Sequence, residues 1–251
     1  MSTSLAARSL LGLWLMLLVA CASDNREDIT PEASAQIYTR LGMEYLRMGK
    51  LNVALEKLQT AIDLDANNVE AQDAIAVLYE KIKLYPDAQK HFEIALKLRP
   101  ESASTLNNYG RFLCDRGEYD EAVAYLQKAM ALPLNDNKWY AYTNLGRCEL
   151  LRGNQDAAET NFRQALQLQE KYAPALLEMQ RISYRQGKYL SARAFLQRYL
   201  EVAEHSAGTL WTAIETEKAL GNPEAARLYR EMLMQKFPTS NEAKQILSSE
   251  K

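Results

Sequence analysis

The sequence predicts an all-α protein, a right-handed superhelix of about six helix-turn-helix units stacked one on the next. Two observations predict this fold class. Ala, Leu, Glu, Gln, Lys and Arg dominate the 251 residues, and only 10 Gly and 7 Pro interrupt them, which is the usage of a helical protein. Small residues also recur at a spacing of about 34 positions, and a repeat of that length is typical of stacked helix pairs.

The first twenty residues have the pattern of a secretory signal peptide. Arg8 precedes an apolar stretch that is too short to span a bilayer comfortably but fits a signal-peptide core. The stretch ends in LVAC, the lipobox of lipoprotein signal peptidase, with Cys21 last. We expect residues 1–20 to be removed and Cys21 to carry diacylglycerol and an N-acyl chain. The alternative is an ordinary signal peptide or membrane anchor with an incidental cysteine.

The next segment, residues 21–34, is predicted to be the lipidated cysteine followed by a flexible tether, because its residues are polar and turn-forming. In the enterobacterial sorting rule, Asp directly after the lipidated Cys retains a lipoprotein at the inner membrane. Ala22 stands there in this sequence. The expected location is therefore the outer membrane, with the rest of the chain facing the periplasm.

Six units follow, and two extra residues near Leu134 separate the third from the fourth. The predicted units are 35–68, 69–102, 103–136, 139–172, 173–206 and 207–240. Residues 241–251 are expected to form a capping segment that covers the last apolar face, because terminal repeats close a stack.

Each unit repeats the same residue types at the same places. Alanine at position 20 and a small residue at position 8 predict a close crossing of the two helices of a unit. Larger apolar residues at positions 7 and 24 and alanine at position 27 predict the core between units. The turn between the helices favours the left-handed backbone conformation. The turn residues are Gly49, Lys83, Gly117, Gly153, Gly187 and Gly221, those at position 7 include Leu41, Ile75, Tyr109, Leu145 and Met179, and those at position 8 are Gly42, Ala76, Gly110, Gly146, Gln180 and Ile214.

The sequence contains no constellation typical of an enzyme. His91 and His205 fall in different units, no HExxH, GxSxG, P-loop or CxxC motif occurs, and His91 is expected to be a solvated helix residue. We therefore predict no catalysis, no metal and no cofactor apart from the acyl chains on Cys21. The formal net charge of −2 and the lack of a dense basic stripe argue against nucleic acid, and no small-molecule substrate is expected.

Cys114 and Cys148 fall in the first helices of neighbouring units, and the periplasm would permit a disulfide between them. They occupy different positions of the repeat, the twelfth and the tenth, so their side chains are expected to point in different directions. Two buried free thiols are therefore favoured over a bridge.

The predicted function is the binding of another protein on the concave wall, which positions 2, 5, 9, 12 and 13 of each first helix would line. Position 9 changes along the stack from apolar to basic. This change predicts an apolar patch at the N-terminal end and a ladder of guanidinium groups in the middle that binds carboxylates or backbone carbonyls. The alternative is that these arginines only solvate the groove. The predicted contact residues are Met43, Leu46, Arg47, Val77, Asn107, Arg111, Arg147, Leu150, Arg181 and Tyr184.

The repeat pattern resembles the tetratricopeptide family over residues 35–240, nearly all of the predicted mature chain. One known binding mode of that family is not expected here. The clamp that holds the carboxylate of a chaperone tail requires Lys and Asn in the first unit, where this chain has Thr39 and Met43.

Longer segments, among them LNNYGRFLCDRGEYDEAVAYLQKAM, resemble the type IV pilus biogenesis lipoprotein family PilF/PilW in order and spacing. The resemblance implies a pilotin. Such a protein binds subunits of the outer-membrane secretin PilQ, brings them along the lipoprotein-sorting machinery to the outer membrane and promotes their assembly into a ring. The alternative is another outer-membrane adaptor, of the kind that scaffolds peptidoglycan hydrolases or other cell-envelope machinery.

Overall fold

A computed structural model describes residues 30–248, and within that range the chain forms thirteen α-helices and no strand. Six are the first helices of the helix pairs: α2 (Pro31–Arg47), α4 (Val69–Lys81), α6 (Ala103–Asp115), α8 (Lys138–Arg152), α10 (Ala173–Arg185) and α12 (Ala207–Ala219). Their partners are α3 (Leu51–Leu64), α5 (Tyr85–Leu98), α7 (Tyr119–Ala131), α9 (Gln155–Leu168), α11 (Tyr189–Leu200) and α13 (Pro223–Lys236), and α14 (Asn241–Ser248) follows.

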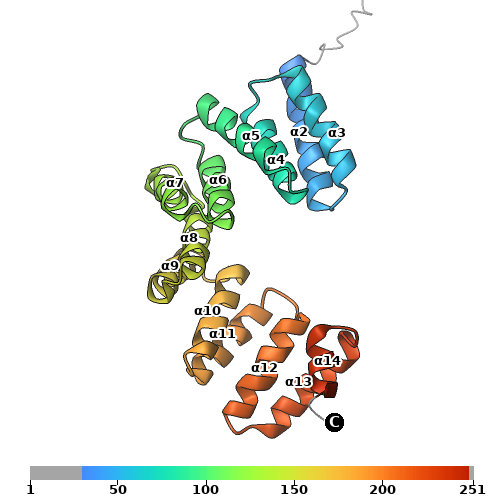
Figure 1. Cartoon of the computed structure of the whole chain (residues 1–251), viewed down its shortest axis with the longest axis vertical. Coiled ribbons are helices and arrows are strands. Elements are labelled where there is room, and N and C mark those ends of the chain that lie inside the picture. Colours follow the sequence, from blue (N-terminus) through green and yellow to red (C-terminus); the bar gives the residue numbers. More distant parts are fainter. Residues whose placement is uncertain (1–29, 249–251) are drawn as a thin grey trace, which may run out of the picture.

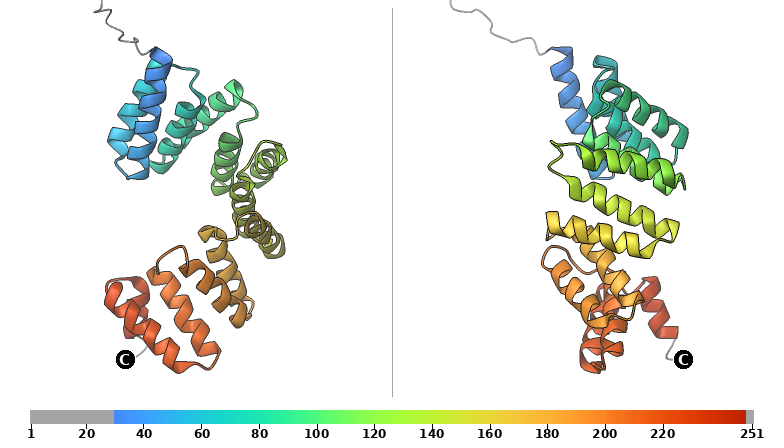
Figure 2. Two further views of the ribbon diagram at one scale, coloured as in Figure 1. Left: turned by 180° about the vertical axis from the view of Figure 1, so that it is seen from behind. Right: turned by 90° about the vertical axis from the view of Figure 1, so that its left-hand side faces the viewer.

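The helix pairs stack into an open arc. Each first helix packs mainly against the second helix of its own pair, and each pair packs against the next. In Figure 1, α6 and α8 lie on the inner side of the arc, and α7 and α9 lie on its outer side. Figure 2 shows the same arc from behind and from the side. The prediction of an all-α superhelix of helix pairs is confirmed.

The turn inside every pair has the predicted backbone conformation. The five turn glycines have φ values between 68° and 91°, and Lys83, at the same place in the second pair, has φ 64°. A lysine therefore adopts the left-handed conformation that the repeat demands, although a residue with a Cβ does so at an energetic cost. The repeat position sets the local backbone more strongly than the residue type.

The glycines at position 8 allow the two helices of a pair to cross closely. A Cβ built on Gly42 would lie 2.6 Å from Cγ of Leu58, and one on Gly110 would lie 2.7 Å from Cγ of Leu126. The alanines at position 20 are also buried, from Ala54 in the first pair onward. The predicted close crossing is confirmed.

The first helix differs from the prediction in two ways. Residues 31–34, which we assigned to the tether, are helical, because the Thr30 hydroxyl caps the backbone N–H of Ala33 and Pro31 suits the first turn. Leu41, at position 7, is 42% exposed, whereas Ile75 at the same position of the second pair is buried. No preceding unit covers Leu41 within the described chain, so its predicted place in the apolar core is wrong.

The two extra residues lengthen the loop between α7 and α8 to residues 132–137, whereas residues 65–68 are enough to join α3 to α4. Asn135 holds the longer loop in place, since its Nδ2 donates to the carbonyl of Ala129 at 2.8 Å and its Oδ1 accepts from the backbone N–H of Asn137 at 3.0 Å. Asn137 and the start of α8 thereby lie on the inner face of the arc. At the far end of the stack, α14 buries Ala243 and Ile246 in the last apolar cluster.

Candidate protein-binding groove

The inner wall of the arc is hollowed at its N-terminal end, and Met43 on α2 lines three of the hollows there. Met43 is 49% exposed. One hollow, of about 380 Å³, lies between α2, α4 and α6. A second, of about 500 Å³, extends from Met43 to α6, the loop 132–137 and the start of α8. All three hollows therefore adjoin the Met43 side chain.

The structure brings half of the predicted contact residues to these hollows. The 380 Å³ hollow is lined by four predicted residues, Met43, Leu46, Arg47 and Val77. Asn107 lines the 500 Å³ hollow. The two residues of the predicted apolar patch, Met43 and Leu46, therefore line one hollow, and their contact with another protein stays a prediction.

Of the other five predicted residues, Arg111 lies on α6 and the remaining four lie further along the stack, on α8 and α10. Leu150 packs against the core cluster around Phe162, and the Tyr184 ring lies 5.7 Å from that of Tyr189. Arg147 is exposed, and no carboxylate lies within ion-pair distance of it in the described part of the chain. Of the three arginines in the predicted ladder, Arg147 is therefore the one whose guanidinium is free to bind a partner.

Arg111 is not available to a partner in the way that the sequence predicted. Its Nη1 and Nη2 donate to the two carboxylate oxygens of Glu80 at 2.6 and 2.5 Å, and Asp115 lies at 3.3 Å. Burial is the largest single influence and would lower the pKa of Arg111, but the hydrogen bonds and charges of Glu80 and Asp115 together outweigh burial and raise the pKa. Arg181 likewise pairs with Glu178 at 2.8 Å. Both guanidiniums therefore already have a carboxylate partner within the chain, and their binding to another protein stays a prediction.

The groove also contains polar residues that we did not predict. Asp73 on α4 and Asn108 on α6 line the 380 Å³ hollow, and Asn108, Asn137 and Tyr140 line the 500 Å³ hollow. One signal was present in the sequence: Asn107 and Asn108 are adjacent asparagines inside a predicted helix, where asparagine is a poor helix former.

Asp73 is the most unusual ionisable group of the groove. Asn108 Nδ2 donates to its Oδ2 at 2.8 Å, while its Oδ1 is buried and accepts no hydrogen bond from the described residues. Burial raises the pKa of the Asp73 carboxyl from 3.8 to about 6, and the polar groups of Asn108 and Thr105 and the charge of Arg111 only partly oppose this rise. The carboxyl stays mostly ionised at neutral pH, in a place where charge is costly.

Comparison with known proteins identifies the repeat and then the family. Residues 35–68 and 101–171 match models described as tetratricopeptide repeat. The crystal structure of PilW, a widely conserved type IV pilus biogenesis factor, is 33% identical and has a TM-score of 0.75, covering 85% of this chain and 98% of that one. The chain belongs to the PilF/PilW family.

A further relative, compared by sequence and by structure, agrees with membership of the PilF/PilW family. The type IV pilus assembly protein PilF of Pseudomonas aeruginosa is 27% identical over 205 residues, which are 82% of this chain and 81% of the relative. The solved structure of Pseudomonas aeruginosa PilF is 26% identical with a TM-score of 0.75, covering 87% of this chain and 99% of that one. The chain is accordingly a tetratricopeptide protein of type IV pilus biogenesis.

This PilF/PilW protein contains a disulfide that corrects our expectation of free thiols. Cys114 and Cys148 are bonded, with their Cα atoms 5.6 Å apart, which is a normal separation for a bridge. Neighbouring first helices are offset along their length, as Glu80 at position 12 and Arg111 at position 9 also show by pairing. A residue at position 12 of one unit therefore lies against position 9 or 10 of the next unit. The different repeat positions of the two cysteines do not keep their sulfur atoms apart.

The histidines of this PilF/PilW chain form no metal site, and the described residues hold no group of three His, Cys, Asp or Glu that could bind a metal ion. His91 is not the solvated residue that we expected. Its Nδ1 lies 2.6 Å from Oε1 of Gln72 and its ring is 5.4 Å from that of Tyr79, and burial lowers its pKa.

No helix in the described range is long and apolar enough to cross a membrane.

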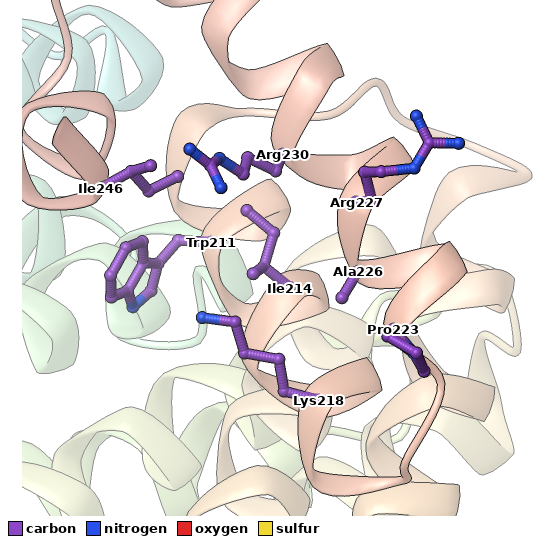
Figure 3. Close-up of a pocket in the computed structure, with 8 residues that line it drawn as sticks. All are labelled: Trp211, Ile214, Lys218, Pro223, Ala226, Arg227, Arg230 and Ile246. Atoms are coloured by element: carbon purple, nitrogen blue, oxygen red, sulfur yellow. The ribbon is translucent and has the colours of Figure 1, made fainter. Parts of the chain in front are cut away.

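A further hollow, of about 240 Å³, lies at the C-terminal end of this PilF/PilW stack between α12, α13 and α14. Figure 3 shows Trp211 and Ile246 side by side at one end of it, with the Lys218 side chain extending toward Trp211 and Arg227 pointing away. Lys218 pairs with Glu215 at 2.9 Å and Arg227 with Glu231 at 2.6 Å. This hollow is smaller than those at Met43 and its cations already have partners, so the N-terminal half of the groove is the better candidate.

Proposed function

We propose that this protein is an outer-membrane lipoprotein pilotin, which holds subunits of the secretin PilQ in the N-terminal half of its groove and promotes their localisation and assembly at the outer membrane. Membership of the PilF/PilW family and the lipobox ending at Cys21 support this proposal. The structural observation that carries it is the group of hollows around Met43 on the inner wall of the arc.

The mechanism follows from the two ends of the molecule. Acyl chains on Cys21 would contribute about 0.8 kcal/mol of membrane affinity for each buried methylene, so several chains anchor a protein firmly. Cys21 lies outside the described residues. Residues 22–30 could span at most about 30 Å between the anchor and α2. A subunit held in the groove thereby shares the lipid address of its carrier, and the role that we propose requires no catalysis.

The experiment compares two apolar side chains that are both exposed, Met43 in the groove (49%) and Leu190 on α11 (69%). A deletion strain is complemented with the wild type, Met43→Lys or Leu190→Lys, and blotted for heat-resistant PilQ multimers. A lysine forced against an apolar contact costs about 1–2 kcal/mol, so we expect about a tenfold loss of multimer with Met43→Lys. Leu190→Lys should behave as the wild type.

Two further measurements decide between causes. Equal melting temperatures of the purified variants would show that Met43→Lys leaves the stack folded, and Cys21→Ser should leave PilQ multimers outside the outer membrane. Unchanged PilQ multimers in the folded Met43→Lys strain would contradict the proposal. Isolation of a peptidoglycan hydrolase with the wild type, in place of PilQ, would favour the adaptor function instead.

A further inference from the structure

The hollow of about 500 Å³ is lined by no charged residue. Four asparagines and one serine supply hydrogen-bonding groups, and Met43, Tyr140 and two alanines supply apolar surface. Tyr140 is 45% exposed. A neutral surface of this kind suits a ligand that offers hydrogen bonds without charge, because an ionised group placed there would lose hydration without gaining an opposite charge.

Two adjacent asparagines in this hollow, Asn107 and Asn108, each use one end of the side-chain amide in a hydrogen bond within the chain. Asn108 Nδ2 donates to Oδ2 of Asp73 at 2.8 Å, and a carboxylate only accepts hydrogen bonds. The amide nitrogen of Asn108 must therefore face Asp73, which leaves its Oδ1 as an acceptor for the groove. Asn107 Oδ1 accepts from Nδ2 of Asn144 at 3.0 Å, which leaves the Asn107 Nδ2 as a donor for the groove.

A free acceptor next to a free donor is complementary to the peptide group, which carries one N–H and one C=O. We propose that Asn108 and Asn107 bind the main chain of an extended segment of the partner, with Asn108 Oδ1 accepting a backbone N–H and Asn107 Nδ2 donating to a backbone C=O. The inference rests on the proposed function and adds the conformation and the chemistry of the segment that is recognised.

An extended segment fits better than a helical or an acidic one. The backbone groups in the middle of a helix already bond to one another and cannot reach the asparagines. An acidic segment finds no cation in this hollow. The neighbouring hollow shares Met43 and Asn108, and its wall combines the apolar side chains of Leu46, Ala74 and Val77 with the charged residues Arg47, Asp73 and Lys81. It could take an apolar side chain of the same segment, since side chains of an extended chain alternate between two sides.

The loop 132–137 gives the hollow its far wall. Asn135 uses its amide inside the chain, on the carbonyl of Ala129 and the N–H of Asn137. It therefore fixes the wall and offers little to a ligand, whereas Asn137 lies in the same wall with no side-chain bond among the described residues. The two extra residues between the third and fourth units thus serve to close this part of the groove.

The experiment uses overlapping synthetic peptides that cover the periplasmic part of PilQ from the same genome, together with that part as a folded protein. The peptide that binds is then made with one backbone N–H at a time replaced by an ester oxygen, which leaves every side chain unchanged. One such replacement should weaken binding to the wild type about fivefold, the value of one hydrogen bond. The same replacement should have no effect on binding to Asn108→Ala.

Asn107→Ala should weaken binding of the unmodified peptide by a similar factor. Asn161→Ala, on the outer helix α9, serves as the matched control. Melting curves show that each variant is folded. An ester replacement that weakens binding equally in the wild type and in Asn108→Ala would overturn the proposal. So would binding of the folded PilQ part with no binding of any peptide. Failure of both the folded part and the peptides to bind would reject the proposed function as well.

Discussion

Asp73 shows how a single residue of the groove influences stability. Its carboxyl is buried between α4 and α6, one of its oxygens has no partner among the described residues, and its pKa is raised from 3.8 to about 6. The folded protein therefore binds more protons than the unfolded chain between these two pH values. The free energy of unfolding falls as the pH rises through this window, and the loss, at most about 3 kcal/mol, is complete above pH 6.

We predict that Asp73→Asn stabilises the protein at pH 7.5 by about 1–2 kcal/mol. The amide removes the buried charge, and its oxygen can still accept the hydrogen bond from Asn108. At pH 4 the variant and the wild type should be equally stable, since the wild-type carboxyl is then protonated in the fold. Urea unfolding at both pH values measures the difference. A variant that is less stable than the wild type at pH 7.5 would show that the charge of Asp73 is favourable where it lies.

The sequence predicted the groove residues only in part, and the reason is visible at Arg111 and Asp73. Position 9 placed Arg111 on the concave side, but its partner Glu80 belongs to the previous unit and 31 positions separate the two. The sequence of α4 alone places Asp73 among residues spaced like those of a solvent-exposed helix face. Burial of that residue depends on Asn108 in the next unit, and single-helix patterns do not contain this information.

At the scale of the helices, the crossing of α6 and α7 depends on Gly110. A Cβ at this position would lie 2.7 Å from Cγ of Leu126 and 3.1 Å from the carbonyl oxygen of Ala122. The leucine end can move, but the backbone of α7 cannot move without separating the pair. The same kind of contact occurs in the first and fourth pairs, so the helix crossing is a general property of the stack.

We predict that Gly110→Ala lowers the free energy of unfolding by about 1–3 kcal/mol, as overpacking of a well-packed core does. Gly208→Ala is the matched control, because Gly208 also lies in a helix but a Cβ there would meet its nearest atom at 3.7 Å. Alanine is the better helix former, so this variant should be neutral or up to about 1 kcal/mol more stable. Thermal or urea unfolding measures both. Equal stability of the two variants would contradict the crossing argument.

Helix positions and turns were the most predictable features, because the repeat determines them within one unit. Lys83 is the clearest case, since its place in the repeat predicted a positive φ in spite of its side chain. The relation between neighbouring units was less predictable. The offset between successive first helices, which brings Cys114 to Cys148, is a property of the packed superhelix and leaves no periodic mark in either helix.

For the whole molecule, the disulfide is a second covalent connection, beside the main chain, between the third and fourth units. It joins α6 to α8 across 34 residues, on the two sides of the longer loop. In the chain-entropy model, closing a loop of that length stabilises the fold by about 4 kcal/mol. The bridge therefore strengthens the junction at which the extra residues interrupt the repeat.

We predict that reduction of the disulfide lowers the melting temperature by roughly 10 °C. Melting curves by circular dichroism, with and without a phosphine reductant, measure the shift. The double variant Cys114→Ala/Cys148→Ala should melt at the lower temperature and be insensitive to the reductant. Alkylation of both thiols in the untreated protein, detected by mass spectrometry, would contradict the bridge.

The hollows at Met43 belong to the same scale. Residues of α2, α6, α8 and a loop meet there only because the stack curves, and the amount of curvature is a sum of small rotations between all of the units. The positions of residues within the repeat predicted which side of the stack would be concave. The helices that approach one another across that side, and hence Asn108 and Tyr140, required the three-dimensional structure.

The bridge between Cys114 and Cys148 also determines how the molecule responds to mechanical load. A pull on the two ends of the chain passes through the sulfur atoms and bypasses the polypeptide between them. That loop, 34 residues in sequence separation, stays slack, and the fully stretched oxidised chain is shorter by about 110 Å than the reduced one. While the bridge is intact, α7 and the loop after it therefore carry none of the applied force.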